Sequence, residues 1–462
     1  MTALDDRNAT SIARPGDPDY ELATRVFNLA APVAPAAAVT ARTVDEVRVA
    51  IRHAQAEGRG VRMLTTGHAS GSYRPMDDAV LIRTEMAGSV DVDSERRIAR
   101  IPAGTQWTDV AAATAPYGLA APHGSAPTVG VVGYLLRGGI SFYGRQVGLA
   151  VNSVRAVDIV TADGELRHVD AVSDPDLFWA LRGGGGGFGV VTAIEVQLFP
   201  ATTVVTGAAF WPAALGVPLL AAWERWALDA PRAAATSFRV LNLPPLPDIP
   251  PVLTNGSMLC VDGVVLGTNG DDPTVVQQQA DDLLGPLRAI AEPVMDTWHL
   301  TTPDDVLSVH MDPTEPVPAQ GDSMLLTELG ADGHTEFLRV LGEGSNSPLV
   351  LAGLRQLGGA MAVPDPDGGA LNHLDANYIY SGAGIPMDAE STAAISAHFG
   401  VIREALAPWD TGRTAPTFVE SVNQPQGHLN SEQVRRADEV RARVDPTGLF
   451  RGDITPNATA LA

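Results

Sequence analysis

The stretch Ala126–Ile140, APTVGVVGYLLRGGI, decides the fold of this chain, read together with Thr65-Thr66-Gly67-His68 upstream. Both stretches are rich in small residues, and glycine allows backbone N–H groups to approach an anion with no Cβ in the way. Successive N–H groups in a turn form a concavity that binds anions. Because the chain contains no lysine, main chain, hydroxyl groups or arginine must hold any phosphate. The two loops therefore predict a two-part clamp for a nucleotide cofactor.

Two familiar nucleotide-binding loops fit this sequence poorly. A Rossmann fingerprint opens a helix directly after the first strand and is followed by an acidic residue. Here the segment before VGVVGY reads GLAAPHGSAPT, which predicts a loop. A Walker loop requires a lysine, and the chain has none. The spacing of the two loops favours FAD over NAD.

Length and charge limit the class of protein. At 462 residues the chain is long enough for two or three domains. A formal net charge of −23 repels nucleic acid and anionic membranes, so neither is an expected partner. The N-terminal residues 1–17 lack the apolar core of a secretory signal, and the apolar run 208–223 is broken by prolines and too short to span a bilayer. A cytoplasmic protein is expected, and its oligomeric state stays open.

Cysteine and metal signatures are sparse. The one cysteine, Cys260, excludes an intrachain disulfide and lies in a predicted strand, SMLCVDGVV, which indicates a core thiol. The sequence contains neither CxxC nor HExxH, so no metal site is expected. The histidines His123, His299 and His310 are interpreted as structural.

The residues up to Pro200 show an irregular alternation of helices and strands, which predicts an α+β fold. Thr43 and Glu46 form a capping box at the start of a predicted helix. Ala162-Asp163-Gly164 predicts a hairpin turn. The glycine run in 182–189 is interpreted as a tight turn next to a ligand, with a flexible linker as the alternative. The predicted elements are helices at 43–57, 107–115 and 174–181, strands at 61–64, 79–83, 98–101 and 190–199, and two strands on either side of the turn at 162–164.

The residues after Pro200 predict a second α+β domain. It contains helices at 219–228 and 274–290 and strands at 257–267, 324–329 and 349–354. A last helix at 431–444 returns toward the first domain. The predicted division is 1–200, 201–411 and 412–462.

Several motifs, taken in order, make the chain similar to a known family. They are TTGH at 65–68, APTVGVVGYLLRGGI at 126–140, VRAVDIVTADG at 154–164, DPDLFWALRGGGGGFGVVTAIEVQLFP at 174–200 and VDPTGLF at 444–450. The chain resembles the bacterial berberine-bridge-enzyme-like FAD-linked oxidases of the vanillyl-alcohol-oxidase/PCMH superfamily. The resemblance implies a PCMH-type FAD-binding domain of two subdomains, and a substrate domain whose antiparallel sheet covers the flavin. In that sheet it implies strands at 354–364, 373–380 and 417–423.

The resemblance also implies how FAD is held. His68 stands where family members commonly link the flavin 8α-methyl group covalently; the alternative is a loop cap that hydrogen-bonds a phosphate. A second, cysteinyl link is absent because that position is Ala126. Tyr134 stands where plant relatives commonly have a histidine. Arg137 stands where relatives usually have a small residue. The expected FAD-binding residues are Thr65, Thr66, Gly67, His68, Ala69, Ser70, Ser125, Thr128, Val129, Gly130, Gly133, Tyr134, Gly138, Gly139, Ile140, Gly189 and Val190.

The expected catalytic residues are Tyr378, Tyr380 and Glu420. Residues two apart on a strand share a face, so the two tyrosines either face the flavin or pack the sheet. Glu420 stands where relatives have asparagine and is either a buried base with a raised pKa or an exposed strand residue. Val434 occupies the position of a tyrosine that is catalytic in many relatives.

Three hypotheses follow. The first is an FAD oxidase that takes hydride from a small organic substrate, a secondary metabolite, sugar or alcohol, and passes the electrons to O2. The second is a flavin-dependent cyclase, lyase or isomerase, which the loss of the family tyrosine at Val434 motivates. The third is a flavin-binding protein without catalysis. Fold analogy supports the cofactor better than the reaction.

Overall fold

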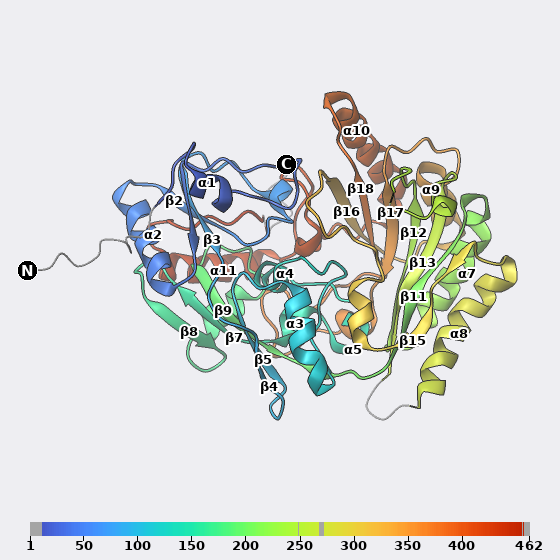
Figure 1. Ribbon diagram of the computed structural model, residues 1–462, viewed down its shortest axis with the longest axis horizontal. Helices are drawn as coiled ribbons and strands as arrows, with labels where there is room; N and C mark the ends of the chain where they lie inside the picture. The colour runs from blue at the N-terminus through green and yellow to red at the C-terminus, as the bar shows by residue number, and fades with distance from the viewer. Residues whose placement is uncertain (1–11, 248, 268–271, 455, 457–462) are drawn as a thin grey trace, which may run out of the picture.

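A computed structural model describes residues 12–247, 249–267, 272–454 and 456. Residues 1–11, most of the segment in which no secretory signal is expected, lie outside the described residues. The blue-to-green N-terminal half and the green-to-orange half with the largest sheet lie side by side in Figure 1.

The first sheet is parallel, with strand order β1-β3-β2. Its strands are β1 (Ala37–Ala41), β2 (Gly60–Leu64) and β3 (Ala79–Thr84), and α2 (Val44–Ala56) connects β1 to β2. The predicted capping box is confirmed, because Thr43 accepts the Glu46 N–H and Glu46 reaches back to the N-cap backbone. Val47 and Ile51 of α2 are fully buried, so one face of the helix covers the sheet.

The second sheet is antiparallel, with strand order β4-β5-β9-β7-β8. Its strands are β4 (Asp91–Asp93), β5 (Ile98–Pro102), β7 (Val154–Val160), β8 (Leu166–Asp170) and β9 (Val190–Gln197). The predicted hairpin is confirmed, since β7 pairs with β8 across the turn at Gly164. The helices α3 (Trp107–Thr114), α4 (Val131–Leu136) and α6 (Pro175–Leu181) belong to this half, as does the pair β6 (Leu119–Ala120) with β10 (Phe199–Pro200).

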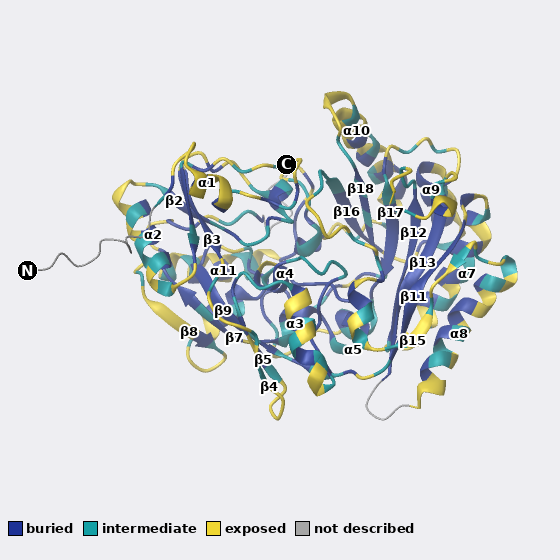
Figure 2. Cartoon of the chain, viewed as in Figure 1, coloured by how far each residue is buried: buried dark blue, intermediate teal, exposed yellow. Residues whose placement is uncertain are grey.

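The largest sheet has eight strands. They are β11 (Val204–Pro212), β12 (Ala234–Leu241), β13 (Met258–Leu266), β14 (Met295–Asp296), β15 (His299–Thr301), β16 (Gln320–Leu326), β17 (Leu351–Gln356) and β18 (Tyr378–Gly384). The helices α7 (Gly216–Asp229), α8 (Pro273–Ile290), α9 (Gly330–Leu341) and α10 (Ala389–Leu406) cover one face. Figure 2 shows the strands buried between these helices and the N-terminal half. We call the face that lies toward the N-terminal half the open face.

The C-terminal residues return to the N-terminal half. The helix α11 (Ser431–Val444) has the bounds that the sequence predicts, and it packs on α6. Beyond it, the Val61 N–H of β2 donates to the Leu449 carbonyl at 2.7 Å. We keep the boundaries near residues 200 and 411 as a proposal.

Three predicted strands are wrong in whole or in part. Residues 417–423 form no strand: a 3-10 turn, Pro416–Phe418, precedes a loop. The side chain of Gln424 bonds the Glu420 N–H and the Phe418 carbonyl, so these backbone groups need no strand partner. In addition, β17 ends at Gln356, and β18 starts only at Tyr378.

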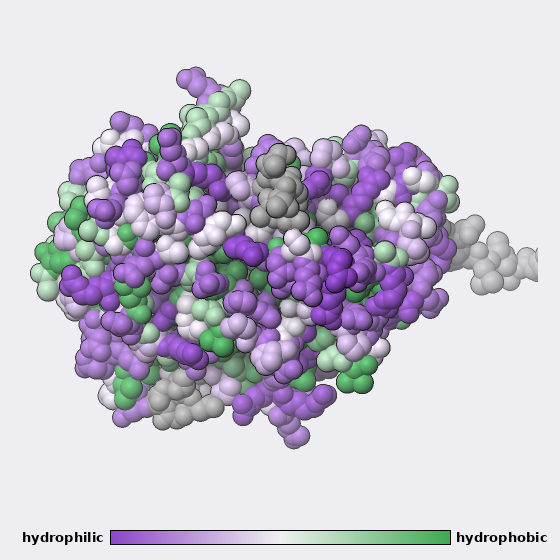
Figure 3. Space-filling view, turned by 180° about the vertical axis from the view of Figure 1, so that it is seen from behind, coloured by the Kyte–Doolittle hydropathy of each residue, from purple (hydrophilic) through white to green (hydrophobic). Residues whose placement is uncertain are grey.

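The rear face of the molecule is mostly polar, in keeping with the net charge. Figure 3 shows the rear face covered mostly by hydrophilic residues, with small hydrophobic groups between them. No helix among the described residues is long and apolar enough to cross a membrane.

Arg145 of the short helix α5 (Gly144–Val147) joins the two halves of the molecule. Its buried guanidinium donates to the carbonyls of Ala230 at 2.9 Å, Ala234 at 2.7 Å and Leu357. All three carbonyls belong to residues in or next to the largest sheet. A short apolar side chain at position 145 would leave them without these donors.

We expect Arg145→Met to destabilise the protein by ~3 kcal/mol or more, because each buried carbonyl that loses its donor costs about 1–3 kcal/mol. Thermal unfolding compares it with Arg435→Met, which removes an arginine whose side chain is 64% exposed. Equal melting temperatures for the two variants would contradict this role.

Candidate functional site

The two glycine-containing loops meet, as the sequence predicts. A Cβ on Gly130 would lie 2.5 Å from Thr65 Oγ1, so only glycine permits this approach. Next to this contact, His68 Nε2 lies 3.1 Å from Thr128 Oγ1. Residues that are far apart in the sequence thus form one surface.

The carbonyl oxygens of the first loop point into the protein. The guanidinium of buried Arg83, on β3, donates to the carbonyls of Ala23, Arg25 and Thr65. The Thr66 carbonyl accepts the Phe27 N–H at 3.0 Å, and the Gly67 carbonyl accepts the Ser70 N–H at 3.2 Å. The opposite, amide side of the loop is the side available to an anion.

His68 is a neutral imidazole held between two groups. Its ring stacks on Phe27 with the centroids 3.7 Å apart and the planes at 13°. Burial lowers its pKa to about 4, although Thr128 and the charge of Asp312 act in the opposite direction. A neutral histidine has a free lone pair on one nitrogen, and this lone pair can attack carbon or accept a proton.

The glycine run forms a tight turn beside a pocket, as the sequence predicts. Gly183, Gly185, Gly186, Gly187 and Gly189 all have positive φ. A Cβ on Gly189 would lie 2.5 Å from the Val160 carbonyl, so this position excludes other residues. The pocket is lined by Met63, Leu64, Thr65, Tyr73, Thr84, Val132, Gly133, Leu136, Arg137, Leu181, Gly183, Gly185–Gly189, Val191, Pro416, His428 and Arg451–Ile454.

The predicted cofactor residues separate into two groups. Thr65, Gly133 and Gly189 line the pocket. Tyr134 does not line it, and its buried hydroxyl has no hydrogen-bond partner among the described residues. The Gly139 N–H donates to Thr417 Oγ1 at 2.8 Å. In contrast, the side chains of Val190 and Ile140 are packed in apolar clusters, so only their backbone is left to contact a ligand.

Ser125 connects the second loop to the open face of the largest sheet. Its hydroxyl donates to Asp312 at 2.7 Å and accepts from Arg355 of β17 at 3.3 Å. The Arg355 guanidinium lies 4.4 Å from the centre of the Phe142 ring. Burial lowers the pKa of Arg355, but arginine stays charged. A cation therefore lies on the open face next to the predicted cofactor loops.

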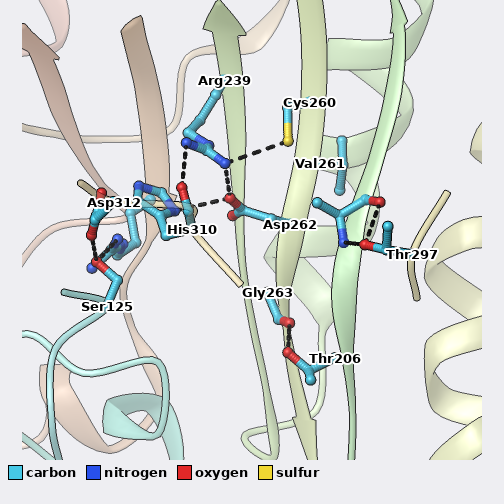
Figure 4. Close-up of polar contacts among 12 residues, drawn as sticks. Ser125, Thr206, Arg239, Cys260, Val261, Asp262, Gly263, Thr297, His310 and Asp312 are labelled. Carbon is cyan, nitrogen blue, oxygen red and sulfur yellow. Dashed lines mark hydrogen bonds and ion pairs between the residues drawn. The ribbon is translucent and has the colours of Figure 1, made fainter. Parts of the chain in front are cut away.

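A second charged cluster lies on the same face (Figure 4). The Asp262 carboxylate of β13 pairs with Arg239 of β12 and accepts from His310 Nδ1 at 2.9 Å. Arg239 also donates to the His310 carbonyl at 3.1 Å and lies 3.5 Å from the Cys260 sulfur. Burial alone would raise the pKa of Asp262, but Arg239 and His310 hold it below its usual range.

The sequence analysis missed this cluster. His310 was interpreted there as structural, and no motif joins it to Asp262 or Arg239. The one available signal was the alternation of β13, because Cys260 and Asp262 share a face of that strand. The prediction of a core thiol is confirmed: Cys260 is fully buried, and burial raises its pKa to about 12.

Glu420 lies beside the first loop, between two glycines. A Cβ on Gly321 would come within 2.9 Å of its Cγ, and a Cβ on Gly71 within 2.3 Å of its carbonyl oxygen. Burial raises the pKa of the Glu420 carboxyl to about 7, against the effect of Arg137. Of the three predicted catalytic side chains, this one lies beside a predicted cofactor loop.

Tyr378 and Tyr380 point away from the cofactor loops. Both belong to the core between the sheet and its helices, and the Tyr378 ring lies 5.4 Å from that of Trp223 on α7. The intervening Ile379 faces the opposite side, where it packs near Ile140. The alternation of β18 thus selects the packing interpretation of the tyrosine pair. Val434, in the family tyrosine position, also packs against an apolar cluster.

Among the described residues, no group of three or more His, Cys, Asp or Glu side chains is arranged to hold a metal ion. The polar groups of the site are instead hydroxyls, two arginines, a histidine and carboxylates. Such groups bind and protonate organic molecules.

Comparison with known sequences shows which domain family contains the two loops. Residues 35–170 match the FAD binding domain family. The chain is 34% identical over 157 residues to (R)-6-hydroxynicotine oxidase of Paenarthrobacter nicotinovorans and 32% identical over 196 residues to carbohydrate oxidase of Microdochium nivale. These matches cover 34% and 42% of this chain and only 34% and 40% of the two relatives.

Solved structures extend the likeness to the whole fold. The BBE-like 1 protein of Physcomitrella patens superimposes with a TM-score of 0.78 at 19% identity, covering 98% of this chain and 97% of that one. The 6-hydroxy-D-nicotine oxidase of Arthrobacter nicotinovorans gives 0.78 at 21% identity, with 96% of both chains covered. Residues 35–170 thus match an FAD-binding domain, and the chain as a whole shares the fold of these BBE-like and 6-hydroxynicotine oxidase structures.

Proposed function

We propose that the protein is an FAD-dependent oxidase that removes a hydride from a small organic substrate and passes the electrons to O2. The observation that carries the proposal is the contact of the two loops beside the glycine-lined pocket, within residues that match an FAD-binding domain. The relatives are named as oxidases of hydroxynicotine and carbohydrate, which favours an oxidase over a cyclase, lyase or isomerase.

The residues of the pocket fit a flavin dinucleotide. A Cβ on Gly133 would meet no atom within 4 Å, so this glycine faces open space. Arg137 and Arg451 place positive charge at the pocket wall in a chain without lysine. The amide side of the Thr65–Ser70 loop and the hydroxyl of Thr128 complete a surface suited to a diphosphate. The buried Tyr134 hydroxyl, which has no hydrogen-bond partner within the described part of the chain, is left for the cofactor.

We propose that His68 carries the flavin covalently. Its Nε2 is engaged by Thr128, while Nδ1 has no hydrogen bond to a described residue. The neutral imidazole that burial enforces is the nucleophilic form. A single link is expected, since Ala126 replaces the cysteine of doubly linked relatives. Bound FAD supplies the two-electron acceptor that no side chain provides.

The substrate is expected on the open face, between the cofactor loops and the largest sheet. Arg355 and His310 provide a hydrogen-bond donor and a proton acceptor there, and Phe142 provides an apolar contact. Glu420 is kept as a proposed acid–base group on the other side of the loops. We propose a secondary metabolite, a sugar or another alcohol as substrate, a cytoplasmic location and membership of the bacterial branch of the family.

The purified protein tests this proposal directly. Flavin absorbance should be present, and hydrogen peroxide should form in air with cellobiose or (R)-6-hydroxynicotine. Under anaerobic conditions the same probes should bleach the flavin stably. A protein without flavin absorbance would contradict the proposal, and turnover without bleaching would favour the non-redox alternative.

Gly133→Leu should give a folded protein that lacks flavin. Leucine suits the helix α4 and meets no protein atom at its Cβ, but its side chain would occupy the pocket. We expect the flavin-to-protein absorbance ratio to fall at least ~10-fold. Gly400→Leu on the exposed side of α10 is the matched control. Full flavin content in Gly133→Leu would show that FAD lies elsewhere.

Acid precipitation tests the covalent link. The wild-type pellet should stay yellow, whereas His68→Ala should release all of its flavin to the supernatant, because alanine offers no nucleophile. Thr128→Ala, which keeps the imidazole, serves as the comparison. A colourless wild-type pellet would disprove the link and leave the non-covalent FAD site standing.

The raised pKa of Glu420 predicts a pH-dependent stability. Between its usual value of 4.5 and about 7, the folded carboxyl keeps a proton that the unfolded one has lost. The wild type therefore loses stability as the pH rises through this window. The free energy of unfolding of Glu420→Gln should therefore rise by ~2 kcal/mol relative to that of the wild type between pH 5 and 7, with no further rise above pH 7.

Denaturant unfolding at several pH values measures this difference. Glu404→Gln, on an exposed position of α10, provides the control because its carboxyl is solvated. A difference between wild type and Glu420→Gln that stays constant with pH would show that the Glu420 carboxyl titrates normally.

A further inference from the structure

His310 belongs to one of two buried histidine–carboxylate pairs among the described residues. In the other, His334 lies 2.5 Å from Glu224, which also accepts the backbone N–H groups of Leu329 and Gly330. That pair lies on the helix-covered face and fixes the start of α9. The pair of His310 and Asp262 lies on the open face and caps no helix.

The geometry around Asp262 sets the tautomer of His310. Asp262 is an anion that is paired with Arg239, and an anion accepts but does not donate. The His310 nitrogen at 2.9 Å, Nδ1, must therefore carry the proton. The second nitrogen, Nε2, then has a lone pair and no hydrogen-bond partner among the described residues, and protein atoms do not seal it off.

The backbone holds His310 at the cofactor side of the sheet. Arg239 bonds its carbonyl, and Met311, the next residue, has a φ of 55°. This conformation costs a residue other than glycine about 1–2 kcal/mol. The resulting turn brings Asp312 to the hydroxyl of Ser125, on the second cofactor loop. The His310 ring itself meets Phe142 edge-on at 5.8 Å.

We propose that His310 is a catalytic residue, the group that accepts the substrate's hydroxyl proton at Nε2, with Asp262 and Arg239 as positioning residues. This inference rests on the proposed function. Oxidation of a CH–OH group to C=O removes one hydride and one proton. A bound FAD would accept the hydride with its two electrons, and Nε2 accepts the O–H proton. The imidazolium that forms is stabilised by the Asp262 carboxylate.

The charged groups around His310 agree with this role. Asp262 and Asp312 favour its protonation, whereas burial, Arg239 and Arg355 oppose it and together lower its pKa. The ring is thus neutral and ready to accept a proton at neutral pH. Burial raises the pKa of Glu420 to about 7, so its carboxyl is mostly protonated at lower pH and is a poorer proton acceptor there.

Nitrogen NMR of the holoprotein with ¹⁵N-labelled histidine tests the tautomer without a substrate. The His310 signals are assigned by their loss in His310→Gln. We expect a neutral ring with its proton on Nδ1 at pH 7, and a move of the proton toward Nε2 in Asp262→Asn. A wild-type ring that is charged at pH 7, or that carries its proton on Nε2, would overturn the proposal.

Anaerobic flavin reduction by cellobiose tests the catalytic step. His310→Gln should slow the reduction at least ~100-fold at pH 7, the usual size of a general-base effect, with little change in the affinity for cellobiose. His299→Gln, which alters an exposed histidine–aspartate pair on β15, should reduce at the wild-type rate. Equal rates in both variants would disprove the role of His310. A wild-type flavin that cellobiose fails to bleach would instead count against the substrate class of the proposed function, and the NMR measurement would still decide on His310.

Discussion

The close contact of two loops is the constraint on which the rest of the structure depends. Thr65 can lie against residue 130 only because residue 130 is a glycine. Arg83 holds the first loop from behind by its carbonyls, and Trp107 donates its N–H to the Val129 carbonyl of the second loop. The residues at the contact are small, and the loop carbonyls behind it are hydrogen-bonded to the protein. The backbone N–H groups and hydroxyls of the two loops are therefore left on one surface. In a chain without lysine, such a surface and the arginines at the pocket wall are the groups that can hold a diphosphate.

Strand alternation then decides which side chains of the largest sheet can reach the cofactor. On β18 it directs Tyr378 and Tyr380 into the helix layer and Ile379 toward the N-terminal half. On β12 and β13 the same rule places Arg239 and Asp262 on the open face. A register shift of one residue in β12 or β13 would turn the charged side chains toward the helices and the apolar side chains toward the site. The register that packs the helices against the sheet therefore also builds the site.

Local patterns predicted the elements well, and long-range contacts account for the misses. The capping box of α2, the hairpin of β7 and β8 and the helix α11 depend on residues near one another in sequence, and all three are confirmed. The segment 417–423 looked like a strand, but the Gln424 side chain bonds its backbone instead.

The candidate site shows the same division. The cofactor loops were predicted because each carries its chemistry in one short motif. His310, Asp262 and Arg239 come from a loop and two strands, and only the folded sheet brings them together. Tyr378 and Tyr380 pack in the core instead of facing the cofactor. A strand's sequence shows which residues share a face but not which face lies toward the cofactor. The same limit explains why the sequence did not predict the role of His310.

The energetics of the open face argue that its charged cluster is not there for stability. An apolar cluster on the same face, which contains Leu241, Met258 and Cys260, shows that β12 and β13 can pack hydrocarbon there. Replacing a buried ion pair by well-packed apolar residues is often neutral or stabilising, since burial of each charge costs several kcal/mol. The fold would therefore be served at least as well by apolar residues at positions 239 and 262. The charged residues instead supply a fixed carboxylate, which keeps the proton of His310 on Nδ1 and leaves Nε2 free. A free Nε2 matters only to a molecule bound between the sheet and the flavin loops.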